Sequence, residues 1–236
     1  MLSRAAANAP VAFMLDVDDT LLDNDRFAAE LRAQLEAAFG EGESERYWAI
    51  YGELRESLGY ADYLGALQRF RHGLEEHPAL LQMSAWLLDY PFAERLYPHA
   101  LETVAHLRTL GTTAILSDGD AVFQPRKIRR AGLWAALHGE VQIFVHKQEN
   151  LAAMRRRYPA AHYVMVDDKP QILAAMKQQL GDRLTTVFVR QGHYAAAAPA
   201  DLQPAPDLAI ACIADLRGRK LDDFLPAAAI ARAATP

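Results

Sequence analysis

The chain of 236 residues contains a single cysteine, Cys212, and this scarcity excludes any disulfide within the chain. A protein without disulfides fits a reducing compartment, so we expect a cytoplasmic location. Residues 208–213, which surround Cys212, are apolar and predict a buried strand. A thiol in such a strand is structural and not reactive.

Long apolar runs are also missing. No apolar run in the sequence approaches the roughly 20 residues that are needed to cross a bilayer. The apolar segment that follows the first ten residues is interrupted at once by Asp16, Asp18 and Asp19. We therefore expect neither a signal peptide nor a membrane partner.

The sequence has no excess of positive charge, because 25 Lys and Arg residues stand against 30 Asp and Glu residues, for a formal net charge of -5. Such a surface repels a phosphate backbone, so we do not expect nucleic acid as a partner. A small anionic substrate is still compatible with this net charge if a metal ion or a nearby lysine offsets the negative potential at the site. With 51% apolar residues the chain can bury a sizeable core. The oligomeric state stays open.

Short apolar runs bounded by turn or acidic residues recur along the chain and are typical of strands buried on both faces of a sheet. They cover residues 11–15, 113–116, 141–145, 163–166, 186–189 and 208–213. Segments of helical period lie between them, and two of these end at Gly111 and Gly181. This alternation predicts an α/β fold with a Rossmann-like parallel sheet in a three-layer α/β/α core.

Residues 24–95 interrupt this alternation, because they contain several amphipathic helical stretches and no convincing strand. The pattern predicts an all-helical cap domain at residues 23–95, inserted into a core of residues 1–22 and 96–236. We expect residues 227–236 to be a poorly ordered tail. Aromatic residues at helical spacing, such as Tyr47 and Tyr51, are more typical of a helical core than of specificity residues.

Residues 13–20, with the sequence FMLDVDDT, form an apolar strand that ends in two carboxylates, Asp16 and Asp18. Ligands of open parallel sheets bind beyond the carboxyl ends of the strands. There one carboxylate can attack phosphorus while its neighbour handles a proton, although a plain acidic turn remains an alternative. A calcium loop is excluded, because Leu21 and Phe27 stand where that loop needs glycine and glutamate.

A second acidic pair, Asp167 and Asp168, follows the apolar run 163–166 and precedes Lys169 and Pro170, which open a helix. Clustered carboxylates repel one another unless a cation neutralises them. Two such clusters at one edge of a sheet can share a magnesium ion, which prefers oxygen ligands.

Polar residues at two further strand ends could complete a phosphate site. The Ser117 hydroxyl, with the backbone N–H groups of Asp118 and Gly119, could hold phosphate oxygens, although serine before Asp-Gly is also a common turn former. Lys147 follows the apolar run 141–145 and could pair with both phosphate and Asp16, although an isolated lysine at a strand end is usually only solvated.

Taken in order, Asp16 and Asp18, Ser117, Lys147, and the acidic pair resemble the motifs of the haloacid dehalogenase superfamily of phosphohydrolases. The resemblance covers the whole chain, and it implies that Asp16 is the nucleophile and Asp18 the general acid and base. It also implies that Ser117 and Lys147 bind phosphate.

For the metal, the resemblance implies that Mg²⁺ is held by Asp16, by the Asp18 backbone carbonyl and directly by Asp168, with Asp167 acting through water. One branch of the family carries a helical cap between its first and second motifs, where residues 23–95 lie. Lys147 is preferred over two other lysines as the active-site lysine, because Lys127 lies along a helix-like run and Lys169 follows the acidic pair.

The resemblance therefore implies a magnesium-dependent phosphatase whose partner is a small-molecule phosphate ester and whose intermediate is an aspartyl phosphate. Two alternatives stay open: a mutase that transfers the phosphoryl group to another hydroxyl, and a non-catalytic module switched by phosphorylation of the aspartate. Dehalogenation is less attractive, because Asp18 supplies an acid that a halide leaving group does not require. The receiver-type switch fold lacks a long helical insert.

Overall fold

The computed structural model describes residues 9–199 and 201–225, so the predicted tail at 227–236 lies outside the described residues. Six strands form one sheet in the order β3-β2-β1-β4-β5-β6, and every neighbouring pair is parallel. The strands are β1 Ala9–Leu15, β2 Thr112–Asp118, β3 Val141–Phe144, β4 Ala160–Asp167, β5 Leu184–Val189 and β6 Leu208–Ile210. The predicted α/β class with a parallel Rossmann-like sheet is confirmed.

The helices fall into two groups along the chain. Between β1 and β2 lie α1 Asn24–Phe39, α2 Glu41–Leu58, α3 Tyr63–Phe70, α4 Ala79–Asp89, the 3-10 helix η1 Phe92–Arg95, and α5 Ala100–Leu110. The α-helices that follow β2 are α6 Phe123–Arg130, α7 Leu133–Ala136, α8 Leu151–Arg157, α9 Pro170–Leu180 and α10 Gly192–Ala196. The remaining 3-10 helices are η2 Lys147–Glu149, η3 Gly181–Arg183, η4 Ile213–Gly218 and η5 Leu221–Phe224.

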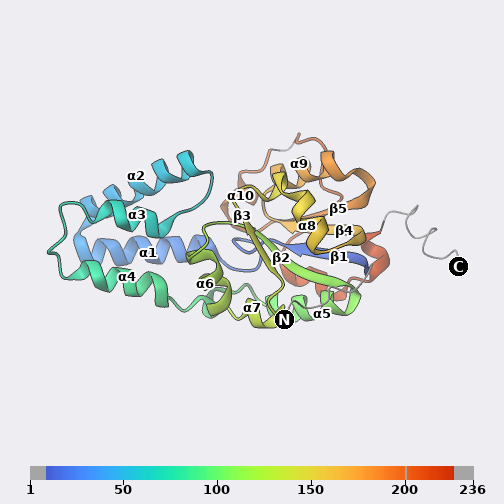
Figure 1. Cartoon of the computed structure of the whole chain (residues 1–236), viewed down its shortest axis with the longest axis horizontal. Coiled ribbons are helices and arrows are strands. Elements are labelled where there is room, and N and C mark those ends of the chain that lie inside the picture. Colours follow the sequence, from blue (N-terminus) through green and yellow to red (C-terminus); the bar gives the residue numbers. More distant parts are fainter. Residues whose placement is uncertain (1–8, 200, 226–236) are drawn as a thin grey trace, which may run out of the picture.

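Alternating side chains of the strands build two hydrophobic clusters, one on each face of the sheet. In β1, Phe13 and Leu15 pack in the cluster that includes α5, whereas Met14 packs with residues of α8 and α9. Figure 1 shows α5 on one side of the sheet and α8 and α9 on the other. The strands are apolar at consecutive positions because both of their faces are covered.

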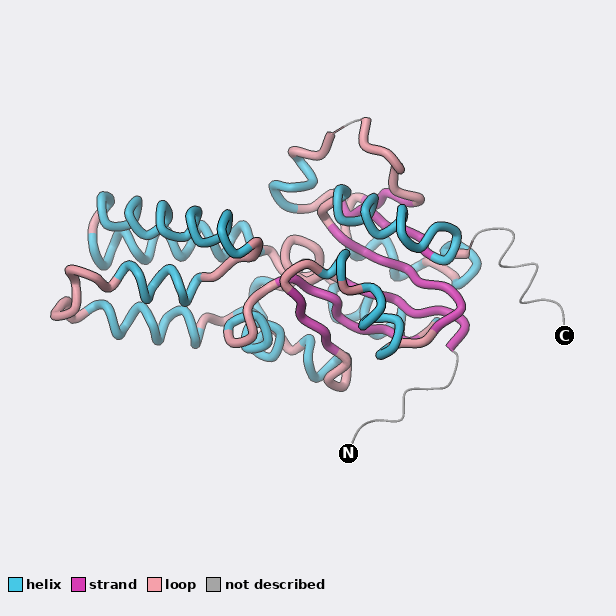
Figure 2. The backbone as a smooth tube through the Cα atoms, turned by 45° about the horizontal axis from the view of Figure 1, so that its top comes forward, coloured by secondary structure: helices cyan, strands magenta, loops and turns pink. Residues whose placement is uncertain are grey.

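Residues 24–95, all of them described, form helices and turns without a strand. Figures 1 and 2 show α1 to α4 as a bundle that extends to one side of the sheet. Phe27 of α1 is central to its packing, with ring centroids 5.1 Å from Tyr63 and 4.9 Å from Tyr90. The described helices include none long and apolar enough to cross a membrane.

The two connections between this helical insert and the sheet run side by side. The Asp23 N–H donates to the Arg95 carbonyl at 2.7 Å, and the Tyr97 N–H donates to the Leu21 carbonyl at 3.0 Å. The Asp23 carboxylate also caps α1 by accepting from the Arg26 N–H at 2.9 Å. The chain therefore leaves and rejoins the sheet at one narrow place.

The expected strand at residues 208–213 is too long by three residues, and the predicted burial of Cys212 is wrong. The strand ends at Ile210, and the Cys212 side chain is only partly buried just before η4. The Asp215 carboxylate accepts from the Ala211 and Cys212 N–H groups at 2.9 and 3.2 Å. These two N–H groups thus bond to a side chain instead of to a neighbouring strand, and the chain continues as the 3-10 helix.

His162 of β4 joins two strands to the C-terminal part of the described chain. Its Nε2 lies 2.9 Å from Thr185 Oγ1, and that hydroxyl donates to the Phe224 carbonyl at 2.7 Å. Because the hydroxyl proton is already used, neutral His162 donates from Nε2. Burial, assisted by the charge of Lys177, lowers the pKa of His162 below its ordinary value.

This lowered pKa predicts a pH-dependent stability. Because the unfolded chain takes up the proton first, the contribution is present above the unfolded pKa of about 6.5 and is lost as the pH falls below it. Buried carboxyl groups with raised pKa values change the stability in the opposite sense, so the effect of His162 is measured as a difference between proteins. Between pH 7.5 and pH 5.5, we expect the free energy of unfolding of the wild type in urea to drop relative to that of His162→Gln, and the exposed control His72→Gln should behave like the wild type. Equal pH dependence in all three proteins would contradict this account.

Candidate active site

The candidate site lies where four neighbouring strands end. Asp16 follows β1, Ser117 lies near the end of β2, Lys147 opens η2 after β3, and Asp167 ends β4. Because β3, β2, β1 and β4 are adjacent and parallel, their carboxyl ends share one edge of the sheet. The fold thus brings together residues that are up to 151 positions apart, from Asp16 to Asp167.

Three buried carboxylates form the centre of the site. Oxygen atoms of Asp16, Asp167 and Asp168 all lie within 4.8 Å of one another, and these residues are at most 3% exposed. Burial, reinforced by the neighbouring carboxylates, raises the pKa of Asp168 to about 9. Burial likewise raises the pKa of Asp16 to about 7, although Lys147 opposes the shift. Ionisation of both carboxyl groups is therefore less favourable than in an exposed aspartate unless positive charge is added.

The ammonium of Lys147 supplies part of that charge. Its Nζ lies 2.5 Å from Asp16 Oδ1 and 2.7 Å from Asp167 Oδ2, and its backbone N–H donates to Asp118 Oδ1 at 2.7 Å. Burial alone lowers the pKa of Lys147, but these three carboxylates outweigh burial and raise it. Among the three lysines considered from the sequence, Lys147 is the one whose ammonium contacts Asp16.

The acidic cluster fits a divalent cation. Within the described part of the chain, Asp16 Oδ2 and both oxygens of Asp168 are buried without a hydrogen-bond partner. Asp167 differs, because its Oδ1 accepts from the Lys169 N–H at 2.9 Å and its Oδ2 faces Lys147. The ammonium of Lys147 and the more distant ammonium of Lys169 do not balance three ionised carboxylates, and hard oxygen donors suit magnesium. The free oxygens of Asp16 and Asp168 are the ones available to hold it.

The carboxylate of Asp18 stands apart from this cluster. Its Oδ1 lies 2.7 Å from the Nζ of Lys127, and its Oδ2 accepts from the Nε2 of Gln124 at 3.1 Å. Both partners belong to α6, and sequence reasoning missed both roles, since Lys127 was considered only as a competitor of Lys147. The available signal was weak: two polar residues three positions apart on a helix that also carries buried apolar residues.

The end of β2 differs in part from the expected phosphate site. The Ser117 hydroxyl accepts from Gln124 Nε2 at 3.0 Å, so it lies at the site. The Gly119 N–H, in contrast, donates to the Phe144 carbonyl at 2.9 Å and is not free for phosphate. Gly119 instead permits close packing at a φ of 156°, since an added Cβ there would lie 2.9 Å from Gln124 Cβ.

A cavity of about 380 Å³ lies between this edge of the sheet and the helical insert. Residues from both sides line it, including Asp18, Asp118 and Lys169 from the sheet side and Trp48, Tyr51 and Arg55 from α2. Tyr47 of α2 is instead fully buried, and its hydroxyl donates to the Tyr63 carbonyl at 2.9 Å.

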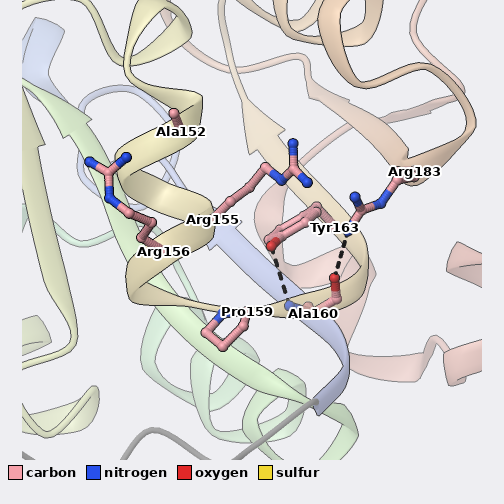
Figure 3. Close-up of a pocket in the computed structure, with 7 residues that line it drawn as sticks. All are labelled: Ala152, Arg155, Arg156, Pro159, Ala160, Tyr163 and Arg183. Atoms are coloured by element: carbon pink, nitrogen blue, oxygen red, sulfur yellow. Dashed lines mark hydrogen bonds between the residues drawn. The ribbon is translucent and has the colours of Figure 1, made fainter.

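A second hollow, of about 460 Å³, is larger but lies at the other end of β4 (Figure 3). Its lining includes Arg155, Arg156 and Arg183, and Figure 3 shows the guanidinium groups of Arg155 and Arg183 near the Tyr163 ring. None of its seven lining residues carries a carboxylate. We therefore place the candidate active site in the cavity beside Asp18.

Comparison with known proteins agrees with the motif-based resemblance. A family model described as haloacid dehalogenase-like hydrolase matches residues 11–179. The crystal structure of a haloacid dehalogenase-like hydrolase from Burkholderia xenovorans LB400 has 53% sequence identity and a TM-score of 0.83, covering 89% of this chain and 99% of that chain. A search of curated proteins gave no match.

More distant structures share the fold and differ in chemistry. L-2-haloacid dehalogenase from Xanthobacter autotrophicus is 19% identical with a TM-score of 0.57, over 87% of this chain and 96% of that chain. A phosphatase from Thermococcus onnurineus is also 19% identical, with a TM-score of 0.59 over 87% and 95%. The fold alone therefore does not choose between dehalogenation and phosphate hydrolysis.

The orphaned oxygens of Asp168 predict how the protein responds to magnesium. Binding of the ion to the folded chain should raise Tm, by the equivalent of about 2.7 kcal/mol at 100 times Kd. Asp168→Asn removes a carboxyl group that must take up a proton when the metal-free chain folds near pH 7, so its metal-free Tm should exceed that of the wild type while its response to magnesium is lost. Thermal unfolding with and without MgCl₂ measures both effects.

The matched control for this experiment is Asp222→Asn, which removes an exposed carboxylate outside the cluster. It should keep the magnesium response of the wild type. An undiminished magnesium response in Asp168→Asn would show that Asp168 does not hold the ion.

Proposed function

Because the chain belongs to the haloacid dehalogenase-like hydrolases, we propose that it is a magnesium-dependent phosphatase that cleaves a small phosphate monoester through an aspartyl phosphate. The observation that carries this proposal is that two carboxylates close in sequence have different surroundings. Asp16 lies in the buried acidic cluster beside Lys147, whereas Asp18 lies at the cavity and outside that cluster.

In the first half-reaction, an oxygen of Asp16 bonds to phosphorus while the bond from phosphorus to the ester oxygen breaks. Lys147 lowers the repulsion between Asp16 and the phosphate dianion, since its ammonium lies 2.5 Å from Asp16 Oδ1. Asp18 gives its proton to the departing ester oxygen. Magnesium, when bound by Asp16 and Asp168, supplies further positive charge beside the phosphate.

In the second half-reaction, water attacks phosphorus and the bond between phosphorus and the Asp16 oxygen breaks. Asp18, now a carboxylate, takes a proton from that water, which restores both aspartates and releases inorganic phosphate. Ser117 and the Asp118 N–H lie at the same edge of the sheet and are the proposed phosphate contacts beside Lys147. Gly119 is left out of this set, because its N–H is bonded to Phe144.

Residues 23–95 are proposed to form a cap domain over this site, and the remaining residues a catalytic core. The adjoining connections at Asp23 and Tyr97 would allow the insert to move as a unit. Closure would exclude water from the aspartyl phosphate. A cavity of about 380 Å³ admits a small molecule, which supports a small phosphate ester as the substrate.

Asp18 also supports phosphate hydrolysis over the dehalogenation found among relatives of this fold. An ester oxygen needs a proton as it departs, whereas a halide leaves without one. The same residues could serve a mutase, and a switch module would retain the phosphoryl group on Asp16. Product analysis separates these outcomes: inorganic phosphate, an isomerised phosphate, or a persistent phosphoprotein.

Two substitutions test the assigned roles with p-nitrophenyl phosphate and magnesium. Asp16→Asn should abolish turnover, because the amide is not a nucleophile towards phosphorus. Asp18→Asn should lower kcat at least about 100-fold, in the range lost with a general acid and base. Asp222→Asn serves as the control and should keep the wild-type kcat.

The same proteins should be incubated with 2-chloropropionate, and halide release should be measured. We expect none from the wild type. Halide release that depends on Asp16, without phosphate release from a panel of phosphorylated metabolites, would replace the phosphatase assignment with a dehalogenase.

A further inference from the structure

We propose that Gln124 and Lys127 of α6 are positioning residues that hold the Asp18 carboxylate in the orientation required for proton transfer. This inference rests on the proposed function, in which Asp18 serves both half-reactions. Each carboxylate oxygen has its own partner on one helix: Oδ1 lies 2.7 Å from Lys127 Nζ, and Oδ2 accepts from Gln124 Nε2 at 3.1 Å. Two contacts at separate oxygens fix the rotation of the carboxylate plane.

The position of Lys127 is itself strongly restricted. The residue is 1% exposed, and its ammonium also donates to Asn24 Oδ1 at 3.0 Å. Four aromatic rings surround the ammonium, with centroids 5.7 to 5.8 Å away: Phe27, Tyr63, Phe92 and Phe123. The first three rings come from the helical insert and the fourth from α6, and they favour a cation at their centre.

A buried pair of this kind is poorly explained by stability. Desolvation of an ammonium costs free energy that a single carboxylate seldom recovers, and replacement of both partners of such a pair by apolar side chains of similar volume is often neutral or stabilising. The Asp18 side chain remains 22% exposed to the cavity, where a proton can be exchanged with a ligand. Lys127 therefore fits a role in orienting a group that acts at the cavity.

Gln124 connects the same carboxylate to the proposed phosphate contact. It is 3% exposed, and its Nε2 donates to Ser117 Oγ at 3.0 Å as well as to Asp18. The absence of a side chain at Gly119 lets Gln124 lie this close to the strand end. The Gln124 amide thus fixes the position of the Asp18 carboxylate relative to the Ser117 hydroxyl, the proposed phosphate contact.

The test uses Gln124→Met and Lys127→Met, which keep side-chain length and remove the polar contacts. Rapid mixing of excess p-nitrophenyl phosphate with the magnesium-loaded enzyme separates the two half-reactions. p-Nitrophenolate departs with little need of a proton, whereas hydrolysis of the aspartyl phosphate needs Asp18 as a base. We expect a burst of p-nitrophenol within about threefold of the wild-type rate, followed by steady-state turnover at least about tenfold slower.

An alkyl phosphate tests the acid role in the same variants, because its leaving oxygen requires the proton from Asp18. We expect its turnover to fall at least about tenfold, with no burst of alcohol. The control is Arg129→Met, an exposed position of the same helix, which should match the wild type in all assays. Lys127→Met is expected to lower Tm, because it leaves Asp18 and Asn24 without their partner, so the positioning role is judged from the separation of burst and steady-state rates, which a purely structural role would not produce.

The possible results separate this inference from the proposed function. Wild-type turnover in both variants, or equal losses in the burst and the steady state, would overturn the positioning role and leave the phosphatase intact. If the wild type hydrolyses no phosphate ester, the proposed function fails and the inference fails with it. Should Lys127→Met not fold, Gln124→Met decides the question by the same two rates.

Discussion

The repulsion among three buried carboxylates is the constraint on which the site depends. Oxygen atoms of Asp16, Asp167 and Asp168 lie within 4.8 Å of one another in a buried position, and the buried ammonium of Lys147 contacts Asp16 and Asp167. Such an arrangement is costly in a folded chain unless a cation offsets it. The cost is concentrated at the carboxyl edge of the sheet, where the proposed nucleophile and the proposed magnesium site lie together.

The parallel sheet is what makes this crowding possible. Its order places the ends of β3, β2, β1 and β4 side by side, so each strand contributes one polar group from a different part of the chain. The two hydrophobic clusters anchor these strands on both faces, which keeps the polar ends rigid. The helical insert closes the remaining side and contributes Asn24 and aromatic rings around Lys127.

Much of this arrangement could be predicted from the sequence, because apolar runs and acidic strand ends are local signals. Asp16 and the pair with Asp168 were predicted from such strand ends, whereas Lys147 was chosen through the order of motifs in the family resemblance, and the structure places the three side chains close together. The contacts of Gln124 and Lys127 with Asp18 were not predicted, since they span 106 and 109 positions and depend on how α6 packs. The predictions for Cys212 and Gly119 failed because they also depended on bonds to residues elsewhere in the fold. The Asp215 carboxylate accepts from the Cys212 N–H beyond the end of the strand, and the Phe144 carbonyl accepts from the Gly119 N–H that was expected to bind phosphate.

The central claim is that phosphorus becomes bonded to Asp16. Rapid acid quenching of the magnesium-loaded enzyme during turnover of p-nitrophenyl phosphate, followed by peptide mass spectrometry, tests it most directly. The account predicts a phosphorylated peptide that contains residue 16, with the modification fragment-mapped to Asp16 and absent from Asp16→Asn. Steady turnover with that peptide unmodified, or with the phosphoryl group on another side chain, would contradict it.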